Sequence, residues 1–185
     1  VVLAVMRDQQ TALQITMCSH LRVVLGNGGQ TRLDSAATMG IGEWHHVAAT
    51  FAQPEMKVYV DGVLSGTASH NYALAHDAGA DLFLGAADHS FYPMSSFAHG
   101  GLDDVRIYDR ALTAAEIDEL ADVAPVEEEP PVEGGDLMLH YAFDPEFTDT
   151  AADASEYGND GIVQGVQYVP AGMVGGGASF DGVDD

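Results

Sequence analysis

The chain has 185 residues, and its 29 acidic and 6 basic side chains give it a formal net charge of −23 at pH 7. Such an acidic surface repels phosphate groups, so the charge argues against nucleic acid and against an anionic membrane as partners. No apolar run approaches the roughly 20 residues of a membrane span, which predicts no membrane insertion, and the single Cys18 cannot form an internal disulfide.

Short apolar runs separated by Gly, Asn and Asp fill the first half of the chain, and this pattern predicts strands joined by turns. The turn signals recur about every 8 to 12 residues without helical segments between them, which is typical of an antiparallel sandwich. We predict strands over residues 2–6, 12–18, 21–25, 44–51, 56–60, 63–68 and 82–84.

One hairpin is marked by its turn. Met56, Val58 and Val60 alternate with other residues, and Asp61-Gly62 then leads into the next strand. Asp-Gly supplies the positive φ angles of a two-residue type I′ turn. In the predicted strand before this hairpin, Trp44 takes a strand position, which favours a packing role for its ring.

After a glycine pair, residues 102–108 alternate as a strand does, and the period then changes. Thr113 followed by Glu116 forms a capping-box pattern, which predicts one short helix over about residues 114–121. Residues 123–135 combine prolines with glutamates and contain no apolar run, which predicts a solvated linker. Three further strands are predicted over residues 137–143, 162–169 and 178–180.

Three blocks of the sequence resemble the laminin-G-like, concanavalin A-like lectin/glucanase jelly rolls that occur as repeats in bacterial surface and secreted proteins. The blocks are residues 42–62 (GEWHHVAATF followed by MKVYVDG), 101–113 (GLDDVRIYDRALT) and 139–185 (LHYAFD, GNDG and SFDGVDD). This resemblance implies an all-β, antiparallel jelly-roll β-sandwich with one short C-terminal helix before the Pro/Glu linker.

The order of the blocks is unusual, because the second resembles the end of a domain and the third resembles a beginning. One interpretation is a tandem array sampled out of phase. Residues 1–122 are then the C-terminal portion of one laminin-G-like domain, 123–135 the linker, and 136–185 the N-terminal portion of a second domain. The other is a permuted single sandwich, in which residues 136–185 fold back and supply complementing strands to residues 1–122.

The resemblance implies a non-catalytic carbohydrate-binding or adhesion module of a secreted or cell-surface protein, with an extracellular location. Its expected partners are a glycan or another extracellular protein. Two alternatives stay open: a structural spacer repeat in a multidomain surface protein, and an accessory domain attached to a glycoside hydrolase.

Some members of this family bind a structural calcium ion, for which oxygen ligands from Asp, Asn and backbone carbonyls are suited. Acidic residues near the second and third blocks are the candidates for such a site here. They are Asp103, Asp104, Asp144, Asp149, Asp153, Asn159 and Asp160. The alternative is that they are turn and cap residues that face water.

A sugar ring stacks on aromatic side chains, while its hydroxyls need polar partners. The segment 87–99 offers aromatic side chains outside a clear strand pattern, and it is the candidate ligand loop. Its candidate residues are His89, Phe91, Tyr92, Phe97 and His99. The alternative is that these rings pack the loop onto the sandwich.

No catalytic residues are expected. Glucanases of this fold place acids as Glu-x-Asp-x-Glu on one strand face, at the short separation that a retaining mechanism needs. The segment Glu116-Ile117-Asp118-Glu119 is superficially close, but Leu120 occupies the last acid position and the helical period spreads the acids around a helix. The sequence therefore predicts that the chain is not an enzyme.

Overall fold

A computed structural model describes residues 2–7, 12–17, 19–26, 30–72, 82–89, 92–95, 97–122, 136–144 and 147–183. These residues form antiparallel strands and one helix, which confirms the predicted concanavalin A-like all-β class. The chain divides into two compact units. Unit 1 contains Val1–Phe97 and Ala111–Asp122, and unit 2 contains Ala98–Arg110 and Val123–Asp185.

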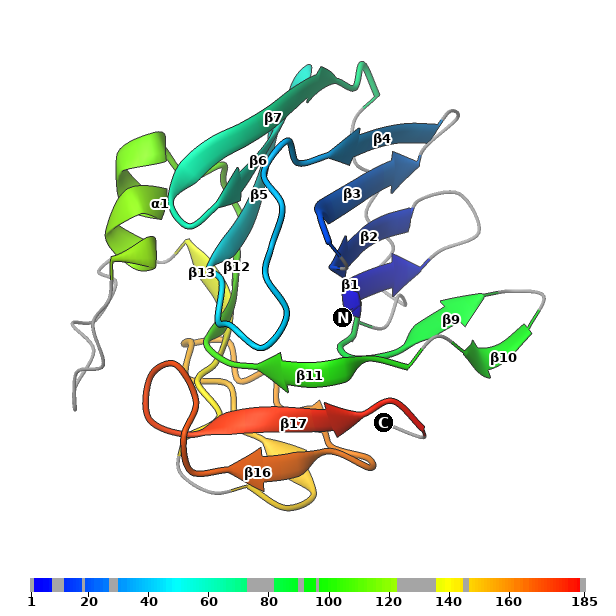
Figure 1. Ribbon diagram of the computed structural model, residues 1–185, viewed down its shortest axis with the longest axis vertical. Coiled ribbons are helices and arrows are strands. Elements are labelled where there is room, and N and C mark those ends of the chain that lie inside the picture. The colour runs from blue at the N-terminus through cyan, green and yellow to red at the C-terminus, as the bar shows by residue number, and fades with distance from the viewer. Residues whose placement is uncertain are drawn as a thin grey trace. The chain divides into compact units, whose positions relative to one another are not determined.

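Unit 1 is built from two main antiparallel sheets, of five and three strands, with a two-stranded ribbon and a helix (Figure 1). The strand orders are β4-β3-β2-β1-β8 and β5-β6-β7, and β9 pairs with β10 in the ribbon. The elements are β1 (Val2–Arg7), β2 (Ala12–Met17), β3 (Leu21–Gly26), β4 (Gln30–Asp34), β5 (Val47–Ala52), β6 (Glu55–Val60), β7 (Val63–Ser69), β8 (Leu82–Phe83), β9 (Ala87–His89), β10 (Tyr92–Ser95) and α1 (Ala114–Ala121).

The core of unit 1 lies between its two main sheets. Every second residue of β3 and β6 faces inward, as the period of a strand requires. Aliphatic side chains from the two sheets form one buried cluster, against which Val47 and Phe51 of β5 also pack. The cluster consists of Leu21, Val23, Leu25, Leu33, Met39, Met56, Val58 and Val60. This apolar contact makes unit 1 a sandwich.

The predicted Asp61-Gly62 hairpin is confirmed, since both residues have positive φ angles, of 50° and 76°. The strand predicted before it is wrong at its start, because residues 44–46 are not part of β5. The Asp61 carboxylate accepts hydrogen bonds from the His46 N–H and from His45 Nδ1, both at 3.0 Å. These contacts hold the chain out of the sheet, and Trp44 is 42% exposed rather than packed.

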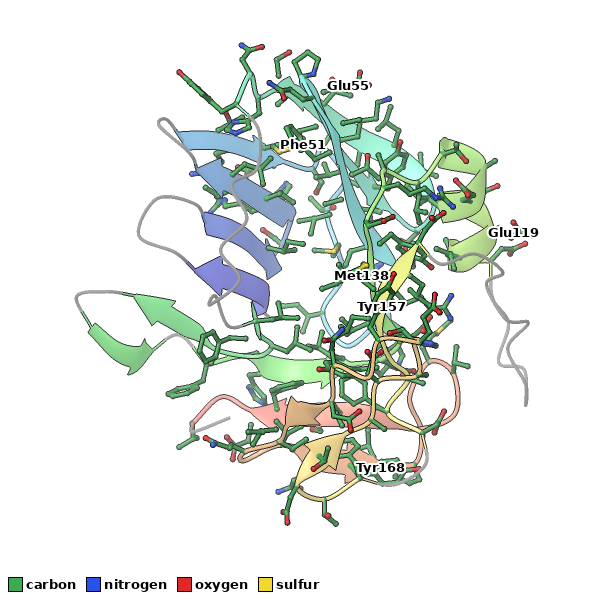
Figure 2. The ribbon with its side chains drawn as sticks, turned by 180° about the vertical axis from the view of Figure 1, so that it is seen from behind. Phe51, Glu55, Glu119, Met138, Tyr157 and Tyr168 are labelled. Atoms are coloured by element: carbon green, nitrogen blue, oxygen red, sulfur yellow. The ribbon has the colours of Figure 1, made fainter. Side chains whose placement is uncertain are left out.

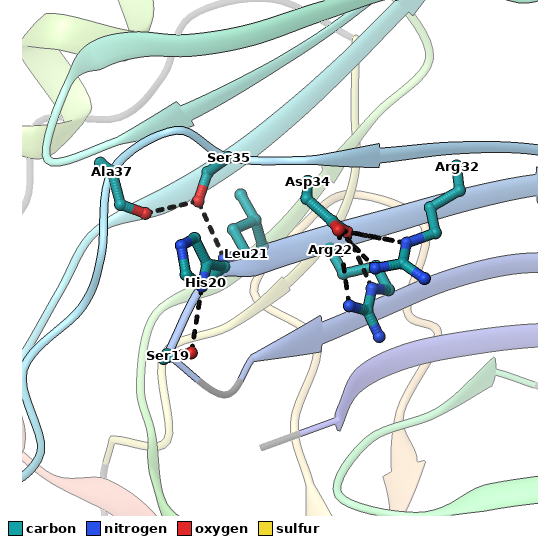
Figure 3. Close-up of polar contacts among 8 residues, drawn as sticks. All are labelled: Ser19, His20, Leu21, Arg22, Arg32, Asp34, Ser35 and Ala37. Atoms are coloured by element: carbon teal, nitrogen blue, oxygen red, sulfur yellow. Dashed lines mark hydrogen bonds and ion pairs between the residues drawn. The ribbon is translucent and has the colours of Figure 1, made fainter.

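Strand β4 carries an ionic cluster on the solvent face of the larger sheet, which the sequence patterns did not indicate (Figure 3). Asp34 accepts hydrogen bonds from Arg32 and from Arg22 of the neighbouring strand β3, the latter at 2.8 Å. The hydrogen bonds from the two arginines hold the pKa of Asp34 well below its usual value.

The residue after Asp34 anchors the end of β4. The buried Ser35 hydroxyl accepts a hydrogen bond from the Leu21 N–H and donates one to the Ala37 carbonyl.

Helix α1 confirms both the predicted range and the predicted cap. The Glu116 N–H donates to the Thr113 hydroxyl, while the Glu116 carboxylate accepts from the Thr113 N–H at 2.7 Å. Ile117 is fully buried and anchors the helix, whereas Asp118 and Glu119 are exposed. The acids of this segment are therefore spread around a helix and share no strand face.

Unit 2 joins a short segment of chain to a long one. Strand β11 pairs with β17 and β12 pairs with β13, so residues 98–110 hydrogen-bond to residues from the other side of the linker (Figure 1). The elements are β11 (His99–Leu102), β12 (Val105–Tyr108), β13 (Leu137–Tyr141), β14 (Thr150–Ala151), β15 (Gly161–Ile162), β16 (Gln167–Val169) and β17 (Gly177–Asp181). The predicted domain boundaries stay a prediction.

Two strands predicted in unit 2 are each interrupted. The strand predicted over residues 102–108 breaks between β11 and β12, where Asp104 has a φ angle of +50° that L-residues seldom adopt. The strand predicted over residues 162–169 breaks into β15 and β16. The strand predicted over residues 178–180 is confirmed as β17.

Within the described residues, no helix has both the length and the apolar character needed to cross a membrane. Cys18 and the linker 123–135 lie outside the described residues.

Candidate functional site

A glycine-rich loop of unit 2, residues 172–176, is held by the carboxylate of Asp103. Asp103 follows β11, and its Oδ2 accepts hydrogen bonds from the N–H groups of Met173 at 2.6 Å and Val174 at 2.8 Å. The loop is closed by a hydrogen bond from the Gly172 N–H to the Gly175 carbonyl at 2.9 Å. An acid that is distant in sequence therefore fixes the conformation of this turn.

A second carboxylate, Asp144, reaches the same loop from the end of β13. Its Oδ1 accepts from the Gly176 N–H at 2.6 Å. Gly175 has a φ angle of +70°, and a Cβ atom at this position would collide with the Asp144 carboxylate. Asp144 is exposed, and no described residue hydrogen-bonds to its Oδ2. We call Asp103, Asp144 and residues 172–176 the Asp–Gly loop.

An aromatic ring lies against the Asp–Gly loop. A Cβ atom on Gly176 would collide with the Tyr168 ring, so this glycine allows the backbone to lie on the ring. The ring is held from behind by an edge-on contact with Phe147, with centroids 5.9 Å apart and an angle of 89°, and Phe147 contacts Phe143. Figure 2 labels Tyr168 on β16 of this unit. The half-buried Tyr168 is thus an oriented aromatic side chain beside an exposed carboxylate.

The pKa values of the adjacent residues Asp103 and Asp104 are shifted in opposite directions. Burial raises the pKa of Asp103, although backbone N–H groups of the loop partly offset this effect. Its Oδ1 is buried, and within the described part of the chain no group hydrogen-bonds to it. Burial also raises the pKa of Asp104, but the hydrogen bond from His140 and the charge of Arg106 outweigh burial and give a net lowering.

Asp104 links two paired strands through a compact ionic cluster. Its Oδ1 accepts from Arg106 Nε at 2.8 Å and lies 2.7 Å from His140 Nε2. Arg106 of β12 and His140 of β13 are directly opposite each other in the strand pair. Asp104 therefore joins the short segment of unit 2 to the long one.

The predicted residues of the 149–160 region stabilise a separate loop. Asp153 accepts from the N–H groups of His140, Ser155 and Asn159, and Asp160 accepts from the Asp153 N–H. Burial raises the pKa of Asp153, yet these hydrogen bonds outweigh it and lower the pKa overall. The Asp149 side chain is exposed.

These placements separate the seven candidate calcium ligands into different sites. Asp103 and Asp144 meet at the Asp–Gly loop, Asp104 binds Arg106 and His140, and the others lie in or near the 149–160 loop. In the described ranges, no group of three or more His, Cys, Asp or Glu side chains could hold one metal ion. A calcium site can also use Asn and backbone carbonyl oxygens, so the calcium site stays a prediction.

The candidate aromatic loop is only partly described. Phe91 lies outside the described residues, while His89 of β9 and Tyr92 of β10 are directly paired in backbone register. Phe97 is half-buried in unit 1, and His99 is exposed on β11 of unit 2. The role of these five residues in binding a ligand stays a prediction.

Tyr168 and the turn at residues 172–176 are site residues that were not predicted from the sequence. A usable signal was present, because Gly175-Gly176-Gly177 is the only run of three consecutive glycines in the chain. What the sequence did not show is that Asp103 and Asp144 converge on it from strands far apart along the chain.

Comparison with known proteins gives a family assignment. Residues 3–118 match the Laminin_G_3 family of the concanavalin A-like lectin/glucanases superfamily. No curated protein matches the chain.

Solved structures show further similarity. The chain is similar to a "putative carbohydrate binding protein" from Bacteroides ovatus ATCC 8483, with 16% identity, a TM-score of 0.54 and coverage of 100% of this chain and 49% of that one. It is also similar to residues 221–444 of an S-layer domain-containing protein from Clostridium thermocellum ATCC 27405, with 28% identity and a TM-score of 0.41. That match covers 62% of this chain and 58% of the other. The chain thus spans about half the length of each structure.

Proposed function

Because the chain belongs to the concanavalin A-like lectin/glucanase superfamily, we propose that it is a non-catalytic carbohydrate-binding module of a secreted or cell-surface protein. Members of one fold differ in function, so the proposal depends on the chemistry of a site. The Asp–Gly loop with Tyr168 is the described site that best meets the needs of a sugar ligand.

One observation carries this proposal: an oriented tyrosine ring and an exposed carboxylate flank the same glycine turn. The exposed part of the Tyr168 ring can contact the apolar face of a pyranose, and a sugar hydroxyl can donate to Asp144 Oδ2. The loop is already fixed by hydrogen bonds from Met173, Val174 and Gly176, so little conformational entropy is lost on binding.

The charge of the chain narrows the expected ligand class. With a formal net charge of −23, the surface repels sulfated and uronic acid-rich glycans at ordinary ionic strength. We therefore propose neutral oligosaccharides as the ligands of the Asp–Gly loop.

A glycan array followed by isothermal titration calorimetry tests this proposal. Tyr168→Ala should lower the association constant for the tightest-binding neutral oligosaccharide at least about tenfold, which corresponds to about 1.4 kcal/mol, whereas Tyr168→Phe should retain binding. Asp144→Asn should weaken binding, because the amide offers a single acceptor oxygen. Tyr157→Ala is the matched control, since Tyr157 is an exposed tyrosine of the same unit.

Undiminished binding by Tyr168→Ala and Asp144→Asn would remove the Asp–Gly loop as the site. Loss of binding on substituting His99 or Phe97 instead would assign the ligand to the 87–99 segment.

A structural spacer is the second candidate function. The observation that favours it is that the Asp103 and Asp153 carboxylates already accept two or more backbone N–H groups each without any ligand. A spacer should bind nothing on a broad glycan array. Its thermal midpoint should also be the same with calcium and with EDTA, so a calcium-dependent rise would contradict the spacer function.

A further inference from the structure

Unit 2 is assembled from two separate stretches of chain. The chain leaves unit 1 at Ala98, forms β11 and β12, and returns to unit 1 at Ala111 to form α1. The remainder of unit 2 follows the linker 123–135. We call residues 98–110 the acceptor segment and residues 136–183 the complement.

The described sheet pairing of the acceptor segment is entirely with the complement. Residues 99–102 pair with 178–181, and residues 105–108 pair with 137–141. The Arg110 guanidinium adds an ion pair with Asp136 at 2.7 Å. Without the complement, both acceptor strands would expose unpaired N–H and C=O groups.

The two segments also share their buried surface. Leu102 and Val105 of the acceptor segment are buried, as are their partners from β13 and β17. The buried side chains of those two strands are Leu139, Tyr141, Ala178 and Phe180. Neither segment can bury these side chains alone, so the acceptor segment is a specific binding surface for a chain with the sequence of the complement.

The acceptor segment and the complement are connected by residues 111–122, which belong to unit 1, and then by the linker 123–135. Its sequence, VAPVEEEPPVEGG, gives an r.m.s. length of roughly 20 Å for a flexible chain. Replacing a chain's own complement by that of a second copy preserves every contact of unit 2. Within unit 2, only the linker path and the entropy of association change, which is the condition for low-cost domain swapping.

We propose that the complement is exchangeable, and that the acceptor segment binds residues 136–183 of a second copy of this chain when the linker cannot close. A short flexible tether gives an effective concentration in the millimolar range, so the closed monomer is favoured at micromolar protein. This inference does not depend on carbohydrate binding.

Disulfide trapping in the full chain tests the proposal. In a Cys18→Ser background, Gly101→Cys and Ser179→Cys introduce thiols at directly paired positions of β11 and β17. Paired positions of antiparallel strands have Cα atoms about 4.5–5.5 Å apart, within disulfide range. The linker is tested intact and with residues 126–133 deleted, and the products are analysed by non-reducing gel and light scattering.

With the intact linker, oxidation should give a monomer with an intrachain disulfide. With the shortened linker, it should give a covalent dimer. Gln167→Cys with Ser179→Cys is the matched control, because both positions lie in the complement and pair in β16 and β17. This control pair should form an intrachain disulfide with either linker. A shortened chain that stays monomeric with the 101–179 disulfide formed would overturn the proposal.

A second measurement covers the case in which the shortened chain fails to fold. A protease site replaces residues 126–132, and isotope-labelled and unlabelled proteins are cleaved and mixed. Native mass spectrometry should then detect complexes of labelled residues 1–125 with unlabelled complement. Dissociation into separate fragments, or retention of only the original pairs after several days, would overturn the proposal.

Discussion

Each unit contains an aspartate that is bound by two nitrogen-bearing side chains of its own. The two aspartates differ in burial. Asp34 of unit 1 binds Arg22 and Arg32 on a solvent-facing sheet, where the three side chains are 35%, 35% and 55% exposed. Asp104 of unit 2 binds Arg106 and His140, and these three are 22%, 8% and 13% exposed.

The same ionic pattern therefore has different consequences in the two units. Water and salt screen the Asp34 cluster, and β4 is also held by the apolar core on the opposite face of its sheet. Around Asp104, water is largely excluded, so removal of the carboxylate takes a counter-charge away from the buried Arg106.

The largest expected loss of stability comes from a substitution in the apolar core of unit 1. Leu21→Ala should lower the free energy of unfolding by about 3 kcal/mol, because the side chain is fully buried and leaves a cavity. Leu64→Ala on the exposed face of β7 should change it by less than about 0.5 kcal/mol. Urea denaturation measures both, and equal effects would show that the sheet is not held by its core.

Asp104→Asn should cost about 2 kcal/mol at pH 7, since the charged hydrogen bond with Arg106 is lost while asparagine still tolerates the positive φ. The folded-state pKa of Asp104 is lowered. Its contribution is therefore present above the unfolded pKa of about 3.9 and is lost as pH falls through the folded value. Urea denaturation should show that the substitution lowers the free energy of unfolding less at pH 3 than at pH 7. An equal loss at both pH values would contradict an ionic origin of the stabilisation by Asp104.

Asp34→Asn should cost only about 0.5 kcal/mol in dilute buffer, because the cluster is exposed. In 1 M salt this cost should fall further, while the cost of Asp104→Asn should change little. Equal salt dependence of the two variants would remove the contrast between the units.

Asp103→Asn should have the smallest effect and the opposite sign. The raised folded-state pKa of Asp103 means that its ionised form is disfavoured by folding. The wild type therefore gains stability as pH falls from 7 through that folded pKa toward the unfolded value. Asparagine keeps an acceptor for the Met173 and Val174 N–H groups, so this variant should be more stable at pH 7 by less than about 0.5 kcal/mol. Thermal melts from pH 7 to pH 4 should show this advantage disappearing.

Local features of the fold were predictable from the sequence because their causes are local. The Asp61-Gly62 turn and the capping box of Thr113 each depend on a few consecutive residues, and both are confirmed. The alternation in residues 56–60 likewise placed β6, because its inward side chains repeat with a period of two.

The features that the sequence did not predict depend on distant partners. Nothing within residues 102–108 shows the break at Asp104, because the partner His140 comes from beyond the linker. Likewise, Asp103 and Asp144 were candidates as acids, but their common target, the turn at residues 172–176, follows only from the pairing of β11 with β17.

The division of unit 2 into two stretches also sets an order of events during synthesis. Unit 1 is complete once Asp122 has emerged, whereas β11 and β12 are made before the strands with which they pair. At about 5–20 residues per second, Arg110 leaves the ribosome roughly 4 to 14 s before Asp181. A nascent chain must therefore carry β11 without its partner strand through this interval, which is when neighbouring nascent chains on one messenger have the opportunity to meet it.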